Sequence, residues 1–338
     1  FNFPAPLDFT NISVNYDTDW LLNYWQTGKV GEVFLKNCEQ ALSTAEPGFS
    51  FNFFDKERET LRNACTEVTS EDDSDLCNLG SLNFARISNM QQLMDVVRLA
   101  TKFLVCGTLA AELPYEKVYS TRAKNRRLGL GLMGLHEWLI QRGSKYEVTD
   151  ELHNWLHIYK AVSDQTADKF CDELGISRSV AKRAVAPTGT IGIIAGTTTG
   201  IEPIFAVAYK RRYLKGTRWH YQYVVDSAAQ EMIDVYDAKP DKIESAIDLA
   251  EDYERRIKFQ YDVQKYVDMS ISSTINLPSW NSELNNPDTV RKFADTLAKY
   301  AHGLRGFTCY PDGARGGQPL TSVPYSEAVE RLGTEFEE

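Results

Sequence analysis

Segments with the apolar spacing of helices alternate with short strand-like segments along the chain, and this alternation constrains the fold more than any other feature. Helical spacing covers 17–42, 93–109, 128–140, 152–174, 246–269 and 289–302. Strand-like segments occur at 49–53, where aromatic residues alternate with polar ones, and at 304–310. Such alternation favours an α/β fold. The 338 residues contain no internal repeat, and their number allows one large α/β barrel domain.

The charge and the cysteines exclude several classes of protein. A formal net charge of −10 argues against a general nucleic-acid binder, which neutralises phosphates with Lys and Arg, but it allows a local nucleotide site. The six cysteines are scattered without a Cys-x-x-Cys pair, so neither a secreted disulfide framework nor a zinc site is expected. No apolar run reaches the length of a membrane span, and no signal peptide is apparent. These features indicate a reducing, cytoplasmic compartment.

The segment 63–83, NACTEVTSEDDSDLCNLGSLN, gathers the residues most suited to chemistry. On an extended strand or a finger-like loop, alternate side chains point to one face, so Asn63, Cys65 and Glu67 would project together. The thiol can deliver or accept a hydrogen atom, the carboxylate can move a proton, and the amide can hold a hydroxyl. Cys77 could close a disulfide with another thiol and deliver two electrons. The segment therefore predicts redox or radical chemistry on a polar substrate.

Other interpretations of this segment stay open from the residues alone. Triples of this kind occur by chance, and many cysteines are inert core residues. Cys65 could also be an ordinary nucleophile of an α/β hydrolase or transferase. No motif places a histidine to activate Cys65, which counts against that interpretation.

A second candidate site is the turn 186–192, which reads APTGTIG. In threonine-rich turns of small residues, backbone N–H groups and hydroxyls converge on an anion, especially where a helix starts. The predicted phosphate-binding residues are Pro187, Thr188, Gly189, Thr190 and Ile191. The alternative is a tight turn capped by its threonines. No Gly-Lys-Ser/Thr follows, so the turn is not a Walker A loop.

Four further features of the sequence are weaker indications of a site. The segment 129–134, GLGLMG, matches a dinucleotide fingerprint, but no buried strand is predicted before it, and close helix packing explains its glycines better. The run 210–212, KRR, could contact phosphate, although such a cluster is more often a solvated loop. The five histidines show no metal-ligand spacing, so no zinc or di-iron site is predicted. Tyr310 is expected to pack beside the site, with a redox-active tyrosine as the alternative.

Taken together, these segments resemble the large catalytic subunit of ribonucleotide reductase. The motifs follow the family's order: 11–14 (NISV), 46–48 (EPG), 63–67 (NACTE), 77–83 (CNLGSLN), 126–135 (RRLGLGLMGL), 186–190 (APTGT), 200–203 (GIEP), 272–278 (SSTINLP) and 306–310 (GFTCY). Each motif alone is weak, but the ordered set is specific and spans nearly the whole chain. The resemblance implies a ten-stranded α/β barrel with a central finger loop. This chain would form its C-terminal two-thirds, with the barrel domain at 1–320 and a C-terminal tail at 321–338.

The resemblance also implies roles for the candidate residues. By motif position, Cys65 would hold the transient thiyl radical that takes the 3′ hydrogen of the ribose. Glu67 would act as the base at the 3′ hydroxyl, and Asn63 would hold the substrate hydroxyls. Cys77 would be one of two thiols that are oxidised as the 2′ hydroxyl leaves as water. Residues 188–190 would grip the substrate phosphates.

The same resemblance predicts what generates the radical. The short spacing between Cys65 and Cys77, the CNLGSLN form and Tyr-Pro-Asp-Gly at 310–313 are most similar to the adenosylcobalamin-dependent class. Relatives served by a ferritin-like, metal-containing small subunit usually carry two adjacent tyrosines, whereas this chain has Cys309-Tyr310. Adenosylcobalamin is therefore the expected cofactor. A radical supplied by a metal-containing partner subunit is the alternative.

The sequence departs from the family pattern in ways that predict an incomplete enzyme. Ala64 and Thr66 stand where many relatives have Pro and Gly, and no cysteine pair follows Tyr310 to re-reduce the site. The second redox cysteine, the allosteric site for a dNTP or ATP effector and the usual dimer helices would lie upstream. We therefore expect a fragment or one piece of a split enzyme that needs an N-terminal piece.

The expected ligands and partners complete the prediction. The substrate would be a ribonucleoside di- or triphosphate, and the reductant would be of the thioredoxin or glutaredoxin type. A homodimer is an option, and neither a membrane nor a direct nucleic-acid partner is expected. A non-catalytic, nucleotide-binding relative of the reductases remains the alternative function.

Overall fold

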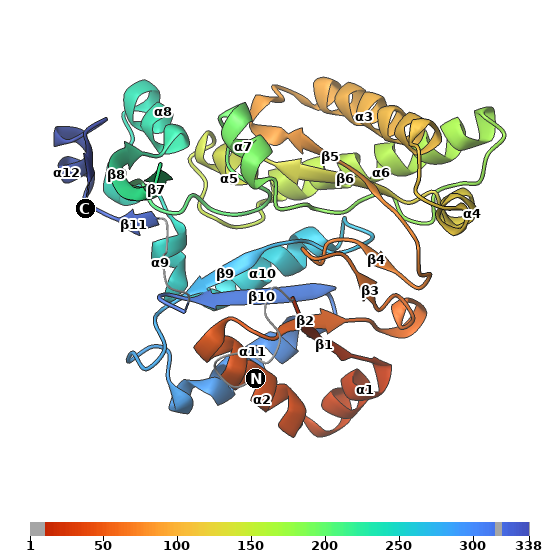
Figure 1. Cartoon of the computed structure of the whole chain (residues 1–338), viewed down its shortest axis with the longest axis horizontal. Coiled ribbons are helices and arrows are strands. Elements are labelled where there is room, and N and C mark those ends of the chain that lie inside the picture. Colours follow the sequence, from red (N-terminus) through yellow and green to blue (C-terminus); the bar gives the residue numbers. More distant parts are fainter. Residues whose placement is uncertain (1–10, 315–319, 338) are drawn as a thin grey trace.

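The computed structural model describes residues 11–314 and 320–337. Most of its strands form two facing groups with a short hairpin between them, and a separate antiparallel sheet lies to one side (Figure 1). The predictions that concern residues 1–10, 315–319 and 338, at the ends of the two expected domains, lie outside the described residues. Within the described residues, no helix combines the length and the apolar character that a membrane crossing requires.

The first group is a four-stranded sheet in the order β1-β2-β10-β9. Its strands are β1 (Ser13–Tyr16), β2 (Gly48–Phe51), β10 (Gly306–Pro311) and β9 (Thr274–Leu277). β1 runs parallel to β2 and β9 runs parallel to β10, whereas β2 and β10 are antiparallel. The two parallel pairs therefore point in opposite directions.

Aromatic alternation in β2 decides which face of this sheet is covered. Phe49 and Phe51 are almost completely buried and pack with Tyr16 and Phe34 in one core, while Ser50 points to the opposite face. Three helices cover the aromatic face: α1 (Thr18–Thr27), α2 (Glu32–Thr44) and α11 (Val290–Ala301). The opposite face is polar and turns toward the interior between the two groups.

The second group begins with the parallel pair β5 (Asn78–Asn83) and β6 (Leu128–Met133). The outer face of this pair is covered by α3 (Met90–Ala110) and α6 (Asp150–Glu173), as Figure 1 shows. Parallel bridges link Leu130 to Arg183 and Val185 to Ile271, so the segment 183–185 lies between β6 and the chain that leads into β9. The two groups thus form one continuous series of neighbouring strands.

Arg183 fixes this connecting segment. Its side chain is completely buried and forms ion pairs of 2.7 Å with both Asp164 of α6 and Asp268. A buried cation is tolerated because both carboxylates compensate its charge.

The prediction of a helix over 128–140 was wrong in its first half. Residues 128–133 are the fully buried strand β6, and only α5 (Leu135–Ile140) is helical. A Cβ added at Gly129 would lie 2.8 Å from Cys77 Sγ, and one at Gly131 would lie 2.5 Å from the carbonyl oxygen of Ala184. The glycines therefore allow close contact inside the sheet rather than helix packing.

Two other predicted segments differ in detail. The expected single helix at 246–269 is divided into α9 (Ala246–Ala250) and α10 (Tyr253–Gln264). The run 210–212 lies in a strand instead of a loop, on the antiparallel sheet β11-β7-β8-β12. Its elements are β7 (Ala208–Lys215), β8 (Arg218–Val225), β11 (Leu320–Ser322) and β12 (Glu335–Glu337).

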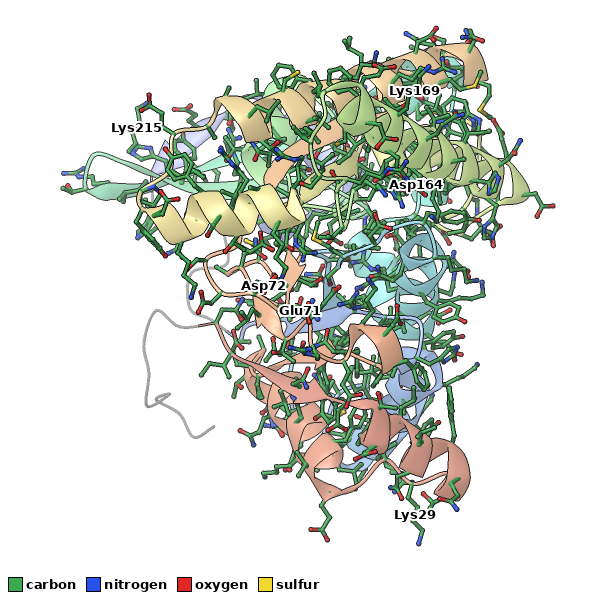
Figure 2. The ribbon with its side chains drawn as sticks, turned by 90° about the vertical axis from the view of Figure 1, so that its right-hand side faces the viewer. Lys29, Glu71, Asp72, Asp164, Lys169 and Lys215 are labelled. Atoms are coloured by element: carbon green, nitrogen blue, oxygen red, sulfur yellow. The ribbon has the colours of Figure 1, made fainter. Side chains whose placement is uncertain are left out.

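The β7–β8 hairpin extends from the body, with Lys215 near its tip (Figure 2). The Arg212 guanidinium stacks 3.9 Å from the centre of the Trp219 ring, so this cation is engaged within the hairpin. The segment predicted as a C-terminal tail contributes β11, α12 (Tyr325–Glu330) and β12 to this sheet. The remaining helices are α4 (Glu116–Asn125), α7 (Gly189–Ala195) and α8 (Ser227–Tyr236).

Candidate active site

The motif around Cys65 forms the turn of a short hairpin made of β3 (Leu61–Arg62) and β4 (Thr69–Ser70). We call residues 61–70 the finger hairpin. The Thr66 N–H donates to the carbonyl oxygen of Asn63 at 3.0 Å, and Thr66 has a φ of 67°. This positive φ breaks the strand alternation that was predicted for the motif, so its side chains do not share one face.

The three motif residues consequently have different surroundings. Cys65 is exposed, Asn63 is exposed, and Glu67 is buried with 2% of its surface accessible. Asn63 Oδ1 accepts a hydrogen bond of 3.0 Å from the Val68 N–H, which turns the amide N–H₂ group outward from the hairpin. Partial burial and the negative charge of Glu67 raise the pKa of the Cys65 thiol. Cys65 and Glu67 therefore remain near each other as predicted, but the exposed thiol and the buried carboxylate lie on different sides of the turn.

Glu67 is held in place through its backbone rather than its carboxylate. Its carbonyl oxygen accepts from the Ser270 N–H at 2.9 Å, which ties the finger hairpin to the strand segment before β9. Within the described residues, the buried carboxylate oxygen Oε2 has no hydrogen-bond partner. A buried acceptor without a partner costs stability, so an oxygen of this kind is characteristic of a site that receives a ligand.

Cys77 lies directly before β5 and is also close to this carboxylate. With Val68 of the finger hairpin, it packs against a small cluster of Ala181, Ala184 and Met269. Burial raises the pKa of the Cys77 thiol to about 12, the charge of Arg127 opposes this shift, and the charges of Asp75 and Glu67 add to it. Cys65 and Cys77 thus share Glu67 as a charged neighbour.

The acidic run 71–75 is tied to the residue before β6. Asp75 Oδ2 pairs with Arg127 Nε at 2.9 Å, and both side chains are buried. Asp72, labelled in Figure 2, pairs with Lys124 Nζ at 2.8 Å and remains more exposed.

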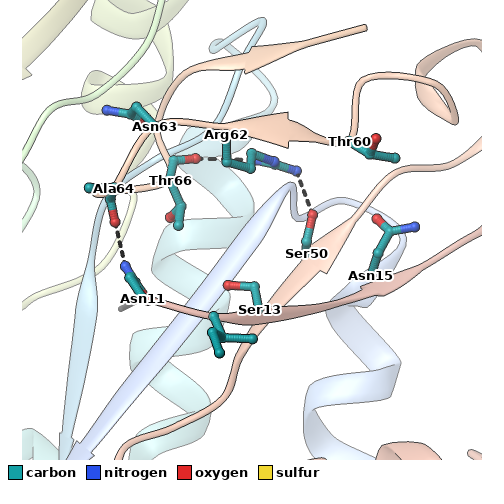
Figure 3. A pocket seen from close by; sticks show the side chains of 10 residues that line it. Asn11, Ser13, Asn15, Ser50, Thr60, Arg62, Asn63, Ala64 and Thr66 are labelled. Carbon is teal, nitrogen blue, oxygen red and sulfur yellow. Dashed lines mark hydrogen bonds between the residues drawn. The ribbon is translucent and has the colours of Figure 1, made fainter. Parts of the chain in front are cut away.

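A polar cavity of about 340 Å³ lies between the finger hairpin and the inner face of β1 and β2 (Figure 3). It is lined by Asn11, Ile12, Ser13, Asn15, Ser50, Thr60, Arg62, Asn63, Ala64 and Thr66. Arg62 crosses its wall, donating to Ser50 Oγ at 3.0 Å and to the Thr66 carbonyl oxygen at 3.1 Å. Burial and the nearby charge of Arg305 lower the pKa of Arg62 to about 9. The two residues that flank Cys65 both face this cavity.

Sequence reasoning missed the contribution of β1 and β2 to this cavity. Ser13, Asn15 and Ser50 are polar residues at alternate strand positions, and aromatic residues occupy the positions between them in β2. That alternation was the available signal, because it predicts a polar inner face opposite the aromatic core.

The predicted phosphate-binding turn connects the segment 183–185 to α7. Thr188 has a φ of 53° and is buried, and its hydroxyl oxygen accepts from the Gly200 N–H at 2.7 Å. The other predicted phosphate-binding residues, Pro187, Gly189, Thr190 and Ile191, are exposed.

The segment 183–185, directly before this turn, lies beside Cys77. A Cβ added at Gly129 would lie 2.8 Å from Cys77 Sγ and 3.5 Å from Ala184 Cβ, so Cys77 and Ala184 meet beside Gly129. Thr188 follows Ala184 by four residues, which is about 13 Å of extended chain. Thr188 therefore lies within about 13 Å of the contact between Cys77 and Ala184.

Tyr310 lies on the inner face of β10, on the same side as Gly306 and Thr308. A Cβ at Gly306 would lie 3.6 Å from Thr66 Oγ1, so this face meets the finger hairpin at the start of β10. Tyr310 is four residues further along, at about 13 Å. Its role beside the site stays a prediction. Among the described residues, no group of three or more His, Cys, Asp or Glu residues is arranged to bind a metal ion.

These features place the exposed thiol of Cys65, the buried carboxylate of Glu67 and the thiol of Cys77 on or beside the finger hairpin of an α/β fold. The chain matches the family described as ribonucleotide reductase, barrel domain, over residues 18–169 and 167–310, and it therefore belongs to this family. The family prediction and the α/β fold of the family are thus confirmed.

The relatives agree with this membership. The vitamin B12-dependent ribonucleoside-diphosphate reductase of Mycobacterium tuberculosis (strain CDC 1551 / Oshkosh) is 28% identical over 365 residues, which cover 92% of this chain and 52% of that protein. A reductase of the same description from Thermoplasma acidophilum is 26% identical and covers 87% of this chain and 44% of its own length. The chain therefore spans about half the length of the curated relatives that it matches.

Solved structures show the same fold. A B12-dependent (class II) ribonucleotide reductase superposes with a TM-score of 0.74 at 15% identity, over 95% of this chain and 49% of that one. The class Id alpha subunit of Actinobacillus ureae gives a TM-score of 0.67 at 14% identity, over 91% of this chain and 66% of that one.

Proposed function

We propose that this chain carries the catalytic residues of a ribonucleotide reductase, which converts ribonucleotides to 2′-deoxyribonucleotides for DNA synthesis through a thiyl radical. One observation carries the proposal. The exposed thiol of Cys65 and the buried carboxylate of Glu67, whose Oε2 has no partner within the described residues, lie two residues apart on the finger hairpin. The substrate is a ribonucleoside di- or triphosphate, and a dithiol reductant of the thioredoxin or glutaredoxin type restores the thiols.

The surroundings of each residue support its role. The exposed Cys65, as a thiyl radical, takes the 3′ hydrogen atom and becomes a thiol, and the free oxygen of Glu67 accepts the proton of the 3′ hydroxyl. The outward amide of Asn63 holds the substrate hydroxyls. Cys77 and the second redox cysteine of the N-terminal piece together supply two electrons and two protons and form a disulfide as the 2′ hydroxyl leaves as water. The high pKa of Cys77 keeps it a thiol at neutral pH, so it can donate hydrogen.

The phosphates of the substrate bind at residues 187–191 in this proposal. The exposed N–H groups at the start of α7 face open space beside Gly189, where an added Cβ would meet no atom within 4 Å. Thr190 supplies a further exposed hydroxyl. Thr188 has a different function, because its buried hydroxyl oxygen accepts the Gly200 N–H and shapes the turn.

The barrel domain is proposed to contain ten strands with the finger hairpin inside. Within the described residues, pairing orders the segments as β5, β6, 183–185, β9, β10, β2 and β1, which leaves β5 and β1 as edges. Three more strands between these edges would close the barrel. The relatives, about twice as long as this chain, have residues enough for such strands and for the second redox cysteine, the effector site and a dimer contact.

Adenosylcobalamin is the proposed cofactor, and when bound it supplies the radical that Cys65 carries. The polar cavity beside the finger hairpin fits part of this cofactor. Its volume of about 340 Å³ accommodates a nucleoside, and its hydroxyl and amide groups suit a ribose and a base. Ser13, Asn15 and Arg62 would hold that part. The alternative, a ferritin-like partner subunit, is less favoured because a single tyrosine, Tyr310, follows Cys309.

Activity of the complete enzyme tests the proposal. We expect this chain, joined to the N-terminal piece that the family resemblance implies, to form deoxynucleotide only when adenosylcobalamin is added. Cys65→Ser should abolish product formation while the circular-dichroism spectrum stays unchanged, and Cys106→Ser is the matched control. Turnover retained by Cys65→Ser would overturn the proposal. Nucleotide binding without product in the wild type would favour a non-catalytic relative.

A further inference from the structure

The turn that precedes α7 is part of a closed loop that runs from Thr188 to Gly200. The Gly192 N–H donates to the Thr188 carbonyl oxygen at 2.7 Å, and the Thr197 N–H donates to the Gly192 carbonyl oxygen at 3.0 Å. The Gly200 N–H closes the loop on Thr188 Oγ1 at 2.7 Å. We call residues 188–200 the α7 loop. Its conformation therefore depends on what holds its second half, residues 196–200.

Glu137, in the first turn of α5, holds that half. The Thr197 hydroxyl donates to Glu137 Oε2 at 2.5 Å, and the Glu137 N–H donates to Thr198 Oγ1 at 3.3 Å. Arg86 Nη2 lies 3.1 Å from Glu137 Oε1 and also donates to the Gly196 carbonyl oxygen at 3.2 Å. The carboxylate thus holds Thr197 directly and Gly196 through Arg86, while the backbone N–H of Glu137 holds Thr198.

The same contacts join the loop to the ends of two strands. Thr197 Oγ1 lies 3.2 Å from Asn83 Oδ1 at the end of β5, and the Gly134 N–H, directly after β6, donates to the Thr198 carbonyl oxygen at 2.7 Å. A Cβ at Gly134 would lie 2.6 Å from Thr197 Oγ1, so a larger residue would displace the anchor. Figure 1 shows α7 beside α5 at this end of β5 and β6.

The chemistry of Glu137 argues for a task beyond packing. Its side chain is 2% exposed, whereas its cation Arg86 is 51% exposed, so the charge is only partly compensated. Burial raises the pKa of Glu137, although Thr197 and Arg86 lower it in part. A buried carboxylate costs free energy that an apolar residue would not. The hydrogen bond to Thr197 and the ion pair with Arg86 offset this cost, and both contacts hold the α7 loop.

We propose that Glu137 is a positioning residue that fixes the α7 loop so that the N–H groups of 189–191 stay oriented toward the substrate phosphates. The identity of the ligand rests on the proposed function, but the anchoring does not. Glu137 does not contact substrate. Its carboxylate holds Thr197 and, through Arg86, Gly196, and thereby fixes the half of the loop that carries the phosphate site.

Hydrogen exchange of the full chain tests the anchoring without any substrate. We expect Glu137→Leu to speed amide exchange across 189–200 by about tenfold, with β5 and β6 unchanged. Glu137→Gln should restore most of the protection, because its amide oxygen still accepts the Thr197 hydroxyl. Glu231→Gln is the matched control, since Glu231 lies 3.9 Å from Arg86 but does not contact the loop. Unchanged exchange at 189–200, or a uniform increase across the chain, would overturn the proposal.

Kinetics of the complete enzyme give the second measurement. Glu137→Leu should raise KM for the nucleotide by about tenfold and leave kcat nearly unchanged, with Glu137→Gln close to wild type. An equal fall in kcat with unchanged KM would contradict a positioning role. If the wild-type enzyme reduces no ribonucleotide, the proposed function fails, whereas the exchange experiment still decides whether Glu137 holds the loop.

Discussion

Arg127 and Asp75 form an ion pair of 2.9 Å in which both side chains are almost completely buried. The pair joins the end of the acidic segment to the residue before β6, next to Cys77. Asp75 also accepts hydrogen bonds from Ser70 Oγ at 2.8 Å and from Asn125 Nδ2 at 2.9 Å. The connection between the finger hairpin and β5 is therefore held by buried charge.

The first prediction concerns this pair. Arg127→Met should lower the free energy of unfolding by about 3 kcal/mol, because it leaves the buried Asp75 carboxylate without its cation. The double variant Arg127→Met/Asp75→Asn should recover most of that loss, since no uncompensated charge remains. Urea denaturation measures both changes. Equal instability of the single and double variants would show that the guanidinium acts through packing alone.

A second prediction compares two arginines on the segment that follows α6. Arg183 is completely buried between Asp164 and Asp268, whereas Arg178 is 59% exposed and pairs with Asp172 at 2.6 Å. Arg183→Leu should cost about 3–5 kcal/mol of stability, because two carboxylates lose their partner in the interior. Arg178→Leu should cost less than about 1 kcal/mol. Thermal unfolding of the two variants separates these expectations, and similar losses would contradict them.

The sequence predicted those elements whose pattern is local. The apolar stripe of α3 and the aromatic alternation in β2 were readable because each has the period of its own secondary structure. β6 was misread, since a fully buried strand carries apolar residues on both faces and resembles a helix segment. Its glycines acquire meaning only through Cys77 and Ala184, which are distant in sequence.

The candidate site was predictable in its composition but not in its geometry. The motif of Asn63, Cys65 and Glu67 identified the right turn, yet the positive φ of Thr66 separates the three side chains. Nothing local indicates that conformation, because Thr66 is not a residue type that favours it. Arg62 was missed for a similar reason, since its partner Ser50 lies on another strand.

A third prediction follows from an exposed apolar row on α3. Leu99 and Phe103 are 72% and 75% exposed, and Cys106 is exposed on the same side of the helix. In the complete enzyme, the additional strands proposed beside β5 should cover this row. Cys106 should react rapidly with a maleimide in the isolated chain and be protected by about tenfold or more when the upstream part is joined. Cysteine introduced at the exposed Lys169 of α6 provides a control site.

The maleimide experiment can also show that something other than the upstream part covers the exposed row on α3. Protection of Cys106 that grows with the concentration of the isolated chain, and is lost in Phe103→Asp, would assign the row to a second copy of the chain. Full reactivity in the complete enzyme would show that the upstream part docks elsewhere.

The last prediction concerns pH and the Cys77 thiol. Burial raises the pKa of this thiol from 9.0 to about 12 in the folded protein. The folded state therefore holds the proton more tightly than the unfolded state does, and the resulting stability is fully present below about pH 9 and is lost as the pH rises toward 12. Between about pH 8 and 10.5, wild type should lose more unfolding free energy than Cys77→Ala, whereas the exposed-site control Cys106→Ala should follow wild type. Because other buried thiols and phenols titrate in all three proteins, the comparison isolates Cys77. If Cys77→Ala follows wild type over this range, the thiol is hydrated in solution, and the site described here is open to water.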